Sequence, residues 1–213
     1  MIFDLSKTNS IANPFIAEMR NENIKLDSIR FRKKLGEFFA FEISKTLSYQ
    51  DIDTQTPLGI AKSSVLTHQP VLATILRAGL PMQQGLLNIF DKADCAFITA
   101  YRKTKKSGDF IIQMEHISAP DLANKTVILI DPMLATGASI VLCAKELINL
   151  YKIKKLHIVA AIASTEGVKH VRANLPKADL WLGAIDEEMT TKSYIVPGLG
   201  DAGDLAFGTK LKD

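Results

Sequence analysis

The chain has 213 residues, enough for one domain with a substantial hydrophobic core, and we expect residues 1–213 to form a single domain. Apolar residues make up 47% and charged residues 23%, which is ordinary for a globular protein. A net charge of +3 is too small to indicate nucleic-acid or membrane binding by itself.

Cysteine and histidine usage argues against disulfide and zinc sites. Cys95 and Cys143 both lie in apolar surroundings, which is typical of core residues in a reducing compartment; a nucleophile is the alternative, without a neighbouring charge pattern to support it. The four histidines show no metal-ligand spacing. The first residues lack the pattern of a signal peptide, and no run of about 20 apolar residues occurs. We therefore expect a cytoplasmic protein.

Helical patterns open the chain. Pro14 suits the start of a short helix that ends near Arg20. Asp27 or Ser28 is a suitable cap for a longer helix to about Leu47, with apolar residues at helical spacing along one face. Two short strands are expected next, at residues 51–55 and 58–62.

From Val71 onward, strands and helices alternate. Strands are expected at 71–76, 95–101, 110–117, 126–130, 156–163 and 179–184, and helices at 81–90, 138–151 and 166–174. Val127–Ile130 and Ile158–Ile162 are apolar without alternation, which is typical of strands covered on both faces. This order predicts an α/β fold, with a parallel β-sheet flanked by helices.

Ligands of such sheets bind beyond the carboxyl ends of the strands. Three candidate residues fall there: Arg77, Arg102 and Asp131 each follow an expected strand. The guanidinium fork of arginine suits a diphosphate, although a surface arginine at a turn is an equally simple interpretation of Arg77.

The segment Val127–Ser139 is the most informative one. It predicts a buried strand, an acidic residue at its end, a short polar loop and a helix start. A carboxylate accepts hydrogen bonds from two sugar hydroxyls, while N–H groups at a helix start, with the hydroxyls of Thr136 and Ser139, suit a phosphate. Gly137 lets the backbone approach that phosphate closely. The alternative is an ordinary helix cap.

Two further segments carry unusual chemistry. Tyr101–Lys106 holds four cations, which fits either a solvated hairpin tip or a flexible arm that closes over a polyanion. Tyr194–Thr209 holds four glycines and two aspartates interleaved with apolar residues. That composition predicts an ordered loop, rather than a helix or a central strand, whose backbone groups suit the edge of a nucleobase.

These blocks resemble the uracil phosphoribosyltransferase family. The resemblance rests on Ile75–Leu80, on Tyr101-Arg102, on Ile130–Gly137, and on Tyr194–Asp204 with Phe207-Gly-Thr209, in the same order over nearly the whole chain. It implies a type I phosphoribosyltransferase fold with a small hood built from the chain ends over the base. It also implies the reaction of uracil with 5-phosphoribosyl 1-diphosphate, which gives UMP and diphosphate.

The resemblance implies the site by position. Asp131 would bind the ribose hydroxyls, Arg77 and Arg102 the diphosphate, and Asp201 would face the phosphoribosyl donor and is the preferred candidate for a general base. The phosphoribosyl moiety would be held by Asp131, Pro132, Met133, Leu134, Ala135, Thr136, Gly137, Ala138 and Ser139. Uracil would be held largely through backbone groups of Ile195, Gly200, Asp201 and Ala202. Mg²⁺ would enter with the diphosphate, without a dedicated protein site. GTP is an effector of some relatives, and the family implies a homo-oligomer.

The chain departs from the family pattern at several positions. Pro132 takes the place of a second acid that related transferases carry, as it does in the uracil family. Ala138 and Ser193 stand where glycine is common, and Leu205 stands where a basic residue is usual. The segment after Arg102 is also divergent, which leaves the contacts of the arm open.

Two other functions compete with the salvage enzyme. One is a regulator that keeps the fold, senses nucleotides and binds RNA or a partner. The other is a transferase for a different base, such as a purine. The intact Gly200-Asp201-Ala202 segment favours the uracil enzyme, because a sensor without catalysis could lose it.

Overall fold

The computed structural model describes residues 1–24, 27–104 and 110–209. Its centre is one large sheet. The strand order is β1 (Ile2–Asp4), β10 (Asp179–Asp186), β9 (Lys155–Ser164), β7 (Thr126–Ile130), β4 (Val71–Leu76), β5 (Cys95–Thr104) and β6 (Phe110–Ser118), and β8 (Met133–Leu134) pairs with β9. Neighbouring strands are parallel, except that β5 and β6 are antiparallel. The expected α/β fold with a mainly parallel sheet is confirmed.

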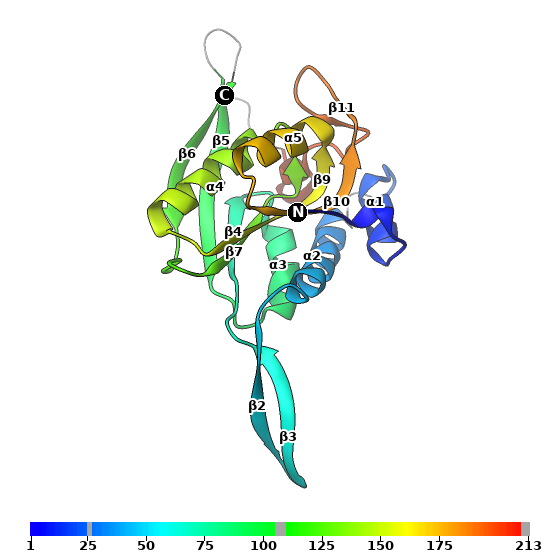
Figure 1. The fold of residues 1–213 in the computed structure, drawn as a ribbon. Helices are drawn as coiled ribbons and strands as arrows, with labels where there is room; N and C mark the ends of the chain where they lie inside the picture. Colours follow the sequence, from blue (N-terminus) through cyan, green and yellow to red (C-terminus); the bar gives the residue numbers. More distant parts are fainter. Residues whose placement is uncertain (25–26, 105–109, 210–213) are drawn as a thin grey trace.

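Helices cover both faces of this sheet (Figure 1). One face carries α4 (Ala138–Tyr151) and α5 (Thr165–Asn174). The other carries η1 (Leu5–Lys7), α1 (Ala12–Arg20), α2 (Ser28–Ser44) and α3 (Leu80–Ile89). None of the helices in the described part of the chain combines the length and apolar character needed to cross a membrane.

The two hydrophobic cores explain why the inner strands are apolar throughout. In β7, Val127 and Leu129 pack under α4 and α5, whereas Ile128 and Ile130 pack under α2 and α3. All four side chains are fully buried. Because successive side chains of a strand point to opposite faces, burial on both faces requires a run without polar residues.

The two long helices of one face approach each other at a pair of glycines. A Cβ on Gly85 would lie 1.8 Å from the carbonyl oxygen of Lys33, and one on Gly36 would lie 2.3 Å from that of Met82. Backbone oxygens cannot move without separating the helices. The close contact of α2 with α3 therefore depends on both glycines.

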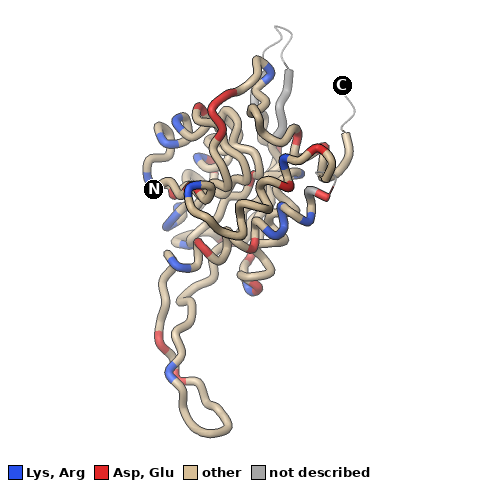
Figure 2. The backbone as a smooth tube through the Cα atoms, turned by 90° about the vertical axis from the view of Figure 1, so that its right-hand side faces the viewer, with Lys and Arg blue, Asp and Glu red and all other residues tan. Residues whose placement is uncertain are grey.

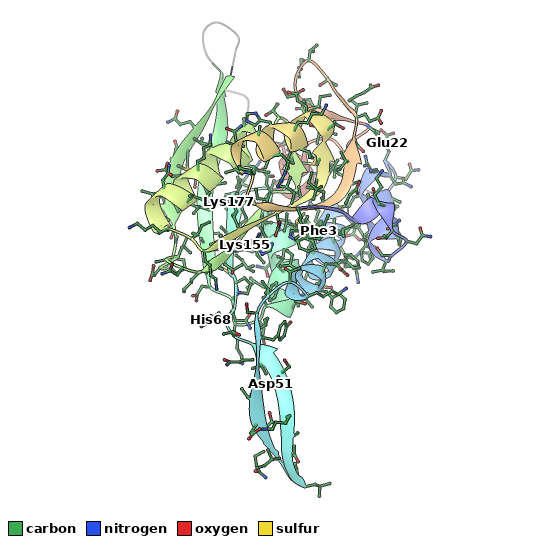
Figure 3. All side chains as sticks on the ribbon, viewed as in Figure 1. Phe3, Glu22, Asp51, His68, Lys155 and Lys177 are labelled. Atoms are coloured by element: carbon green, nitrogen blue, oxygen red, sulfur yellow. The ribbon has the colours of Figure 1, made fainter. Side chains whose placement is uncertain are left out.

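A two-stranded hairpin extends away from this body (Figures 1 and 3). It consists of β2 (Tyr49–Thr56) and β3 (Gly59–Leu66), paired in register from Tyr49 with Leu66 to Thr56 with Gly59. Both strands are longer than the sequence predicts. Figure 2 shows charged residues along the hairpin but none at its tip.

Elements from the two chain ends meet beside the carboxyl end of β10, which agrees with the expected hood. They are α1 and a small antiparallel pair, β11 (Glu188–Met189) and β12 (Ile195–Val196), followed by α6 (Ala202–Phe207). The prediction that this stretch forms no helix is wrong. Asp201 caps α6 by accepting a hydrogen bond from the Asp204 N–H at 2.9 Å, and the cap allows one short helix despite Gly203.

A cluster of polar side chains lies at the amino ends of β9 and β10. The buried carboxylate of Asp179 lies 2.8 Å from Lys155 Nζ and 2.6 Å from the N-terminal ammonium. Beside it, the indole N–H of Trp181 donates to Nδ1 of His157 at 3.1 Å. Burial lowers the pKa of His157 to about 4, so the imidazole is neutral at pH 7 and accepts this bond. Phe3 of β1 stacks on Trp181 with ring centroids 3.9 Å apart.

The contact between α2 and α3 predicts that alanine at Gly85 destabilises the protein, although alanine has the higher helix propensity. Gly85→Ala should lower the free energy of unfolding by at least about 1 kcal/mol, because overpacking costs more than the gain in propensity. Urea denaturation measures this change. Gln84→Ala, on the exposed side of the same helix, should change stability by less than about 0.5 kcal/mol. A more stable Gly85→Ala protein would contradict the close contact.

Candidate active site

The carboxyl ends of the parallel strands bring the expected site residues to one edge of the sheet. Thr74 of β4 is in register with Ile130 of β7, so Arg77 and Asp131 follow neighbouring strands at the same edge. Leu76 is in register with Thr99 of β5, three residues before Arg102. The prediction that Arg102 follows this strand is wrong, because β5 continues through Arg102 to Thr104 in its pairing with β6. The side chain of Arg102 lies outside the described residues, as do residues 105–109 of the basic segment.

The loop after β7 is held in place by its own backbone. The carbonyl of Pro132 accepts from the N–H groups of Ala161 and Ile162 at 3.0 and 3.1 Å. Oδ1 of Asp131 accepts from the Met133 N–H at 3.2 Å, which forms a local turn. The Asp131 side chain stays half-buried, whereas Pro132 is buried. Pro132 therefore anchors the loop on β9, and Asp131 remains at its rim.

The start of α4 has the form expected of an anion site. Gly137 occupies the position before the helix with φ of 77°, which favours glycine, and it has no side chain to cap the helix. The Thr136 hydroxyl accepts a long hydrogen bond from the Ala138 N–H at 3.4 Å. Ala138 is the first helical residue, so alanine in place of the family's glycine is accommodated there. Thr136 and Ser139 are half-buried beside the first turn. The N–H groups in the first turn of a helix have no partner within the helix, and a phosphate would provide one.

The start of α5 supports the loop Asp131–Ser139. The sequence did not reveal this support. The fully buried Ser164 donates its hydroxyl to the Ala135 carbonyl at 2.6 Å and accepts from the Gly167 N–H at 2.8 Å. A Cβ on Gly167 would lie 2.1 Å from the Ala135 oxygen. Ser164 precedes a helix, so only its role as a cap could be predicted from the sequence.

A second loop, from Ile195 to Ala202, carries the residues expected to bind a base. Ile195 and Ala202 are buried, whereas Gly200 and Asp201 are exposed. Gly200 has a φ of 93°, so a side chain there would strain the backbone. The exposed peptide groups are thus carried by a segment whose two ends pack into the hydrophobic core with α2.

Two departures from the family pattern now have a physical context. Ser193 has a φ of 60°, a left-handed conformation that glycine adopts without strain and that costs other residues about 1–2 kcal/mol. Leu205, where a basic residue is usual, is half-buried and packs against the core under α6. Leucine at this position contributes packing instead of charge.

An arginine after β4 contacts the helix that follows the second loop. The side chain of Arg77 lies at the end of β4, and its NH2 is 3.5 Å from Oδ1 of Asp204 in α6. A Cβ on Gly203 would lie 3.8 Å from Cβ of Ala78, so α6 packs directly against the segment that follows β4. Arg77 therefore lies beside α6, which directly follows the loop from Ile195 to Ala202.

Arg32 of α2 is a further charged group under this region. Its side chain is fully buried, and burial lowers its pKa to about 10, while the negative charge of Asp201 raises it. The sequence places Arg32 beside apolar residues on the inner face of a helix, but no local pattern connects it with Asp201. Their relation depends on the contact between α2 and α6.

Metal ligands of the protein's own are absent from the described residues. Across 1–24, 27–104 and 110–209, no group of three His, Cys, Asp or Glu side chains could hold a metal ion. Burial, and to a lesser extent the negative charge of Asp131, raises the pKa of the Cys143 thiol to about 12, so this thiol is protonated and inert at pH 7. The described polar groups of the site are arginine, aspartate, hydroxyl and backbone groups.

Comparison with known proteins agrees with this geometry. The family model described as uracil phosphoribosyltransferase matches residues 6–209. The chain is 46% identical to the uracil phosphoribosyltransferase of Porphyromonas gingivalis over 99% of both chains. It is 36% identical to that of Thermococcus gammatolerans over 94% of this chain and 92% of the relative.

Solved structures give the same fold. A protein from Aquifex aeolicus superposes with a TM-score of 0.89 at 26% identity over the whole of both chains. An adenine phosphoribosyltransferase from Trypanosoma brucei, with AMP, pyrophosphate and ribose-5-phosphate, has a TM-score of 0.58 at 12% identity, covering 94% of this chain and 87% of its own. The second likeness concerns the fold alone. The match of the family model, with full-length relatives at up to 46% identity, shows that the chain belongs to the uracil phosphoribosyltransferase family.

Proposed function

We propose that this chain transfers the phosphoribosyl group of 5-phosphoribosyl 1-diphosphate to uracil, yielding UMP and diphosphate. It thereby acts as a pentosyltransferase of pyrimidine salvage. The observation that carries the proposal is the placement of two different loops at one site: a helix start suited to phosphate and a glycine-rich loop suited to a flat base. Arg77, which follows the strand next to β7, forms an ion pair with Asp204 of α6, directly after the glycine-rich loop.

The donor would bind along the loop Asp131–Ser139. The 5-phosphate would accept hydrogen bonds from N–H groups in the first turn of α4 and from the hydroxyls of Thr136 and Ser139, since Gly137 at the cap position has no side chain. Asp131, at the rim of the loop, would accept hydrogen bonds from the two ribose hydroxyls. Such charge-assisted bonds are stronger than neutral ones.

Arg77 and Arg102 would bind the diphosphate. In the structure, Arg77 is paired with Asp204, and its side chain is 41% exposed. On binding, the diphosphate would replace Asp204 as the partner of the guanidinium. Because the described residues offer no metal-binding cluster, Mg²⁺ would be held mainly by the diphosphate oxygens. The ion would contribute neutralisation of the leaving group's charge.

Uracil would bind against Ile195 and the segment Gly200–Ala202. Its N3–H and carbonyl oxygens need alternating acceptors and donors, which peptide groups supply without charge. In the reaction, the bond between the anomeric carbon and the diphosphate oxygen breaks, and uracil N1 forms the new bond. We assign Asp201 as the acceptor of the N1 proton, because its exposed carboxylate lies on this loop.

The substrate assignment is tested directly. The purified protein with Mg²⁺ and 5-phosphoribosyl 1-diphosphate should convert labelled uracil to UMP, and should form no nucleotide from hypoxanthine or guanine. Product chromatography measures both. Product from a purine but not from uracil would contradict the assignment. Adding GTP to the same assay tests whether GTP, an effector of some relatives, acts on this enzyme. The expected cytoplasmic location stays a prediction.

The assigned donor site makes a second prediction. Asp131→Asn and Arg77→Ala should each lower kcat/KM about 10–100-fold, because each removes charge-assisted bonds of about 1.5–3 kcal/mol. Steady-state kinetics measure this loss, and urea denaturation checks the fold. Asp94→Asn, an exposed carboxylate that precedes β5, serves as the control and should keep full activity. Unchanged turnover in both site variants would contradict the assignment.

We also propose that the hairpin β2–β3 packs against a second copy of the chain. A two-stranded hairpin without further packing is only marginally stable in water. This hairpin also exposes apolar side chains: Leu58 fully, Ile60 by 68% and Ile52 by 40%. Burial of these side chains by a partner would stabilise the hairpin.

Light scattering after size-exclusion chromatography tests this proposal. The unchanged protein should elute as a dimer or larger, and Leu58→Lys combined with Ile60→Lys should shift it toward the monomer. Lys62→Gln, an exposed polar change on the same hairpin, should leave the mass unchanged. A monomeric parent protein, or an unchanged mass in the double variant, would contradict the role of the hairpin.

A further inference from the structure

An arginine and an aspartate far apart in the sequence bind the backbone of one residue in the base-side loop, from Ile195 to Ala202. Arg20, the last residue of α1, forms two parallel bonds with Asp186 at the end of β10: NH1 to Oδ2 and NH2 to Oδ1, both 2.7 Å. NH1 of Arg20 also donates to the carbonyl of Gly198 at 3.0 Å. Oδ2 of Asp186 accepts from the Gly198 N–H at 2.9 Å. We call these three residues the Gly198 clamp.

The charged side chains of the clamp are largely buried, so they need partners that replace water. The side chain of Asp186 is 8% exposed and that of Arg20 is 22% exposed. A buried carboxylate is tolerated only with partners that compensate its lost hydration. Here a bidentate guanidinium and a backbone N–H supply them, so neither side chain is free to leave the loop.

Both backbone hydrogen-bonding groups of Gly198, its N–H and its carbonyl, are occupied by the clamp. Gly198 has a φ of 54°, and a Cβ on it would lie 2.2 Å from the carbonyl oxygen of Ile195. It therefore lies at a tight turn between Ile195 and Gly200, the two sides of the proposed uracil contacts. Fixing the two peptide units that flank Gly198 fixes the distance between the two sides.

We propose that Arg20 and Asp186 are positioning residues for uracil: they set the shape of the base-side loop without contacting the substrate. The proposal rests on the base-binding role given above to Ile195 and Gly200–Ala202. Placement errors of about 1 Å in such a site cost up to about 100-fold in rate, so a loosened clamp should weaken use of uracil selectively. The donor loop should be spared, because it is anchored separately by Pro132 and Ser164.

The chain offers a matched control on the same strand. Asp179, at the other end of β10, is also a buried carboxylate paired with a cation, Lys155 at 2.8 Å, but lies at the opposite edge of the sheet. Asp179→Asn therefore removes a comparable buried charge without touching the loop. Any loss of stability common to Asp179→Asn and Asp186→Asn cannot explain a difference in uracil kinetics between them.

The test is steady-state kinetics on Arg20→Ala, Asp186→Asn, Arg20→Lys and Asp179→Asn, with uracil and the donor varied separately. In Arg20→Ala and Asp186→Asn, the KM for uracil should rise about tenfold or more, whereas that for the donor should stay within about twofold. Arg20→Lys keeps the charge but not the fork, so its KM should be intermediate. The double variant Arg20→Ala with Asp186→Asn should have a KM for uracil close to that of either single variant, since both changes act on one clamp.

Amide hydrogen exchange gives a readout that does not depend on catalysis. Exchange at residues 196–201 should become faster in Arg20→Ala and Asp186→Asn and should be unchanged in Asp179→Asn. Unchanged exchange would overturn the clamp, as would equal rises of both KM values or an unchanged KM for uracil. A parent protein that does not use uracil at all would instead contradict the proposed function, while the exchange result still decides whether the clamp holds the loop.

Discussion

The constraint on which the molecule depends is the burial of a parallel sheet on both faces. Parallel strands run the same way, so every loop that follows β4, β7, β9 and β10 leaves at one edge. Helices close both faces, and polar side chains can project only at the edges. Asp131 and Arg77 are therefore neighbours for the same reason that the strands before them are apolar. The site is a consequence of how the core is built.

The loops at this edge are held by buried polar groups rather than by apolar packing alone. Ser164 holds the donor-side loop through the Ala135 carbonyl, and the pair of Arg20 with Asp186 holds Gly198. Glycines appear where these loops touch other backbone, as at Gly167. A hydrogen bond fixes direction as well as distance, which apolar contact does not. Exposed peptide groups can thus stay rigid without being buried.

The sequence predicted what depends on local pattern. The bounds of β4, β7 and α4 are those expected, because each combines an apolar run or helical spacing with a clear end signal. The expected positions of Arg77 and Asp131 follow from these strands. In contrast, β1 was missed, since a three-residue edge strand leaves no periodic signal, and α6 was missed because its aspartate cap compensates for glycine. The contact of Arg20 with Asp186 spans 166 residues, and no local pattern encodes it.

The polar cluster at the opposite edge has a practical consequence for spectroscopy. Trp181 is the chain's single tryptophan, and it is buried between Phe3 and the neutral imidazole of His157. Intrinsic fluorescence excited at the indole therefore reports on the docking of β1 against β10. Trp181 is in register with Val159, and Val159 with Ile130, so the indole lies only two strands from the residue that precedes Asp131. The emission spectrum can thus follow unfolding of this part of the sheet without any introduced label.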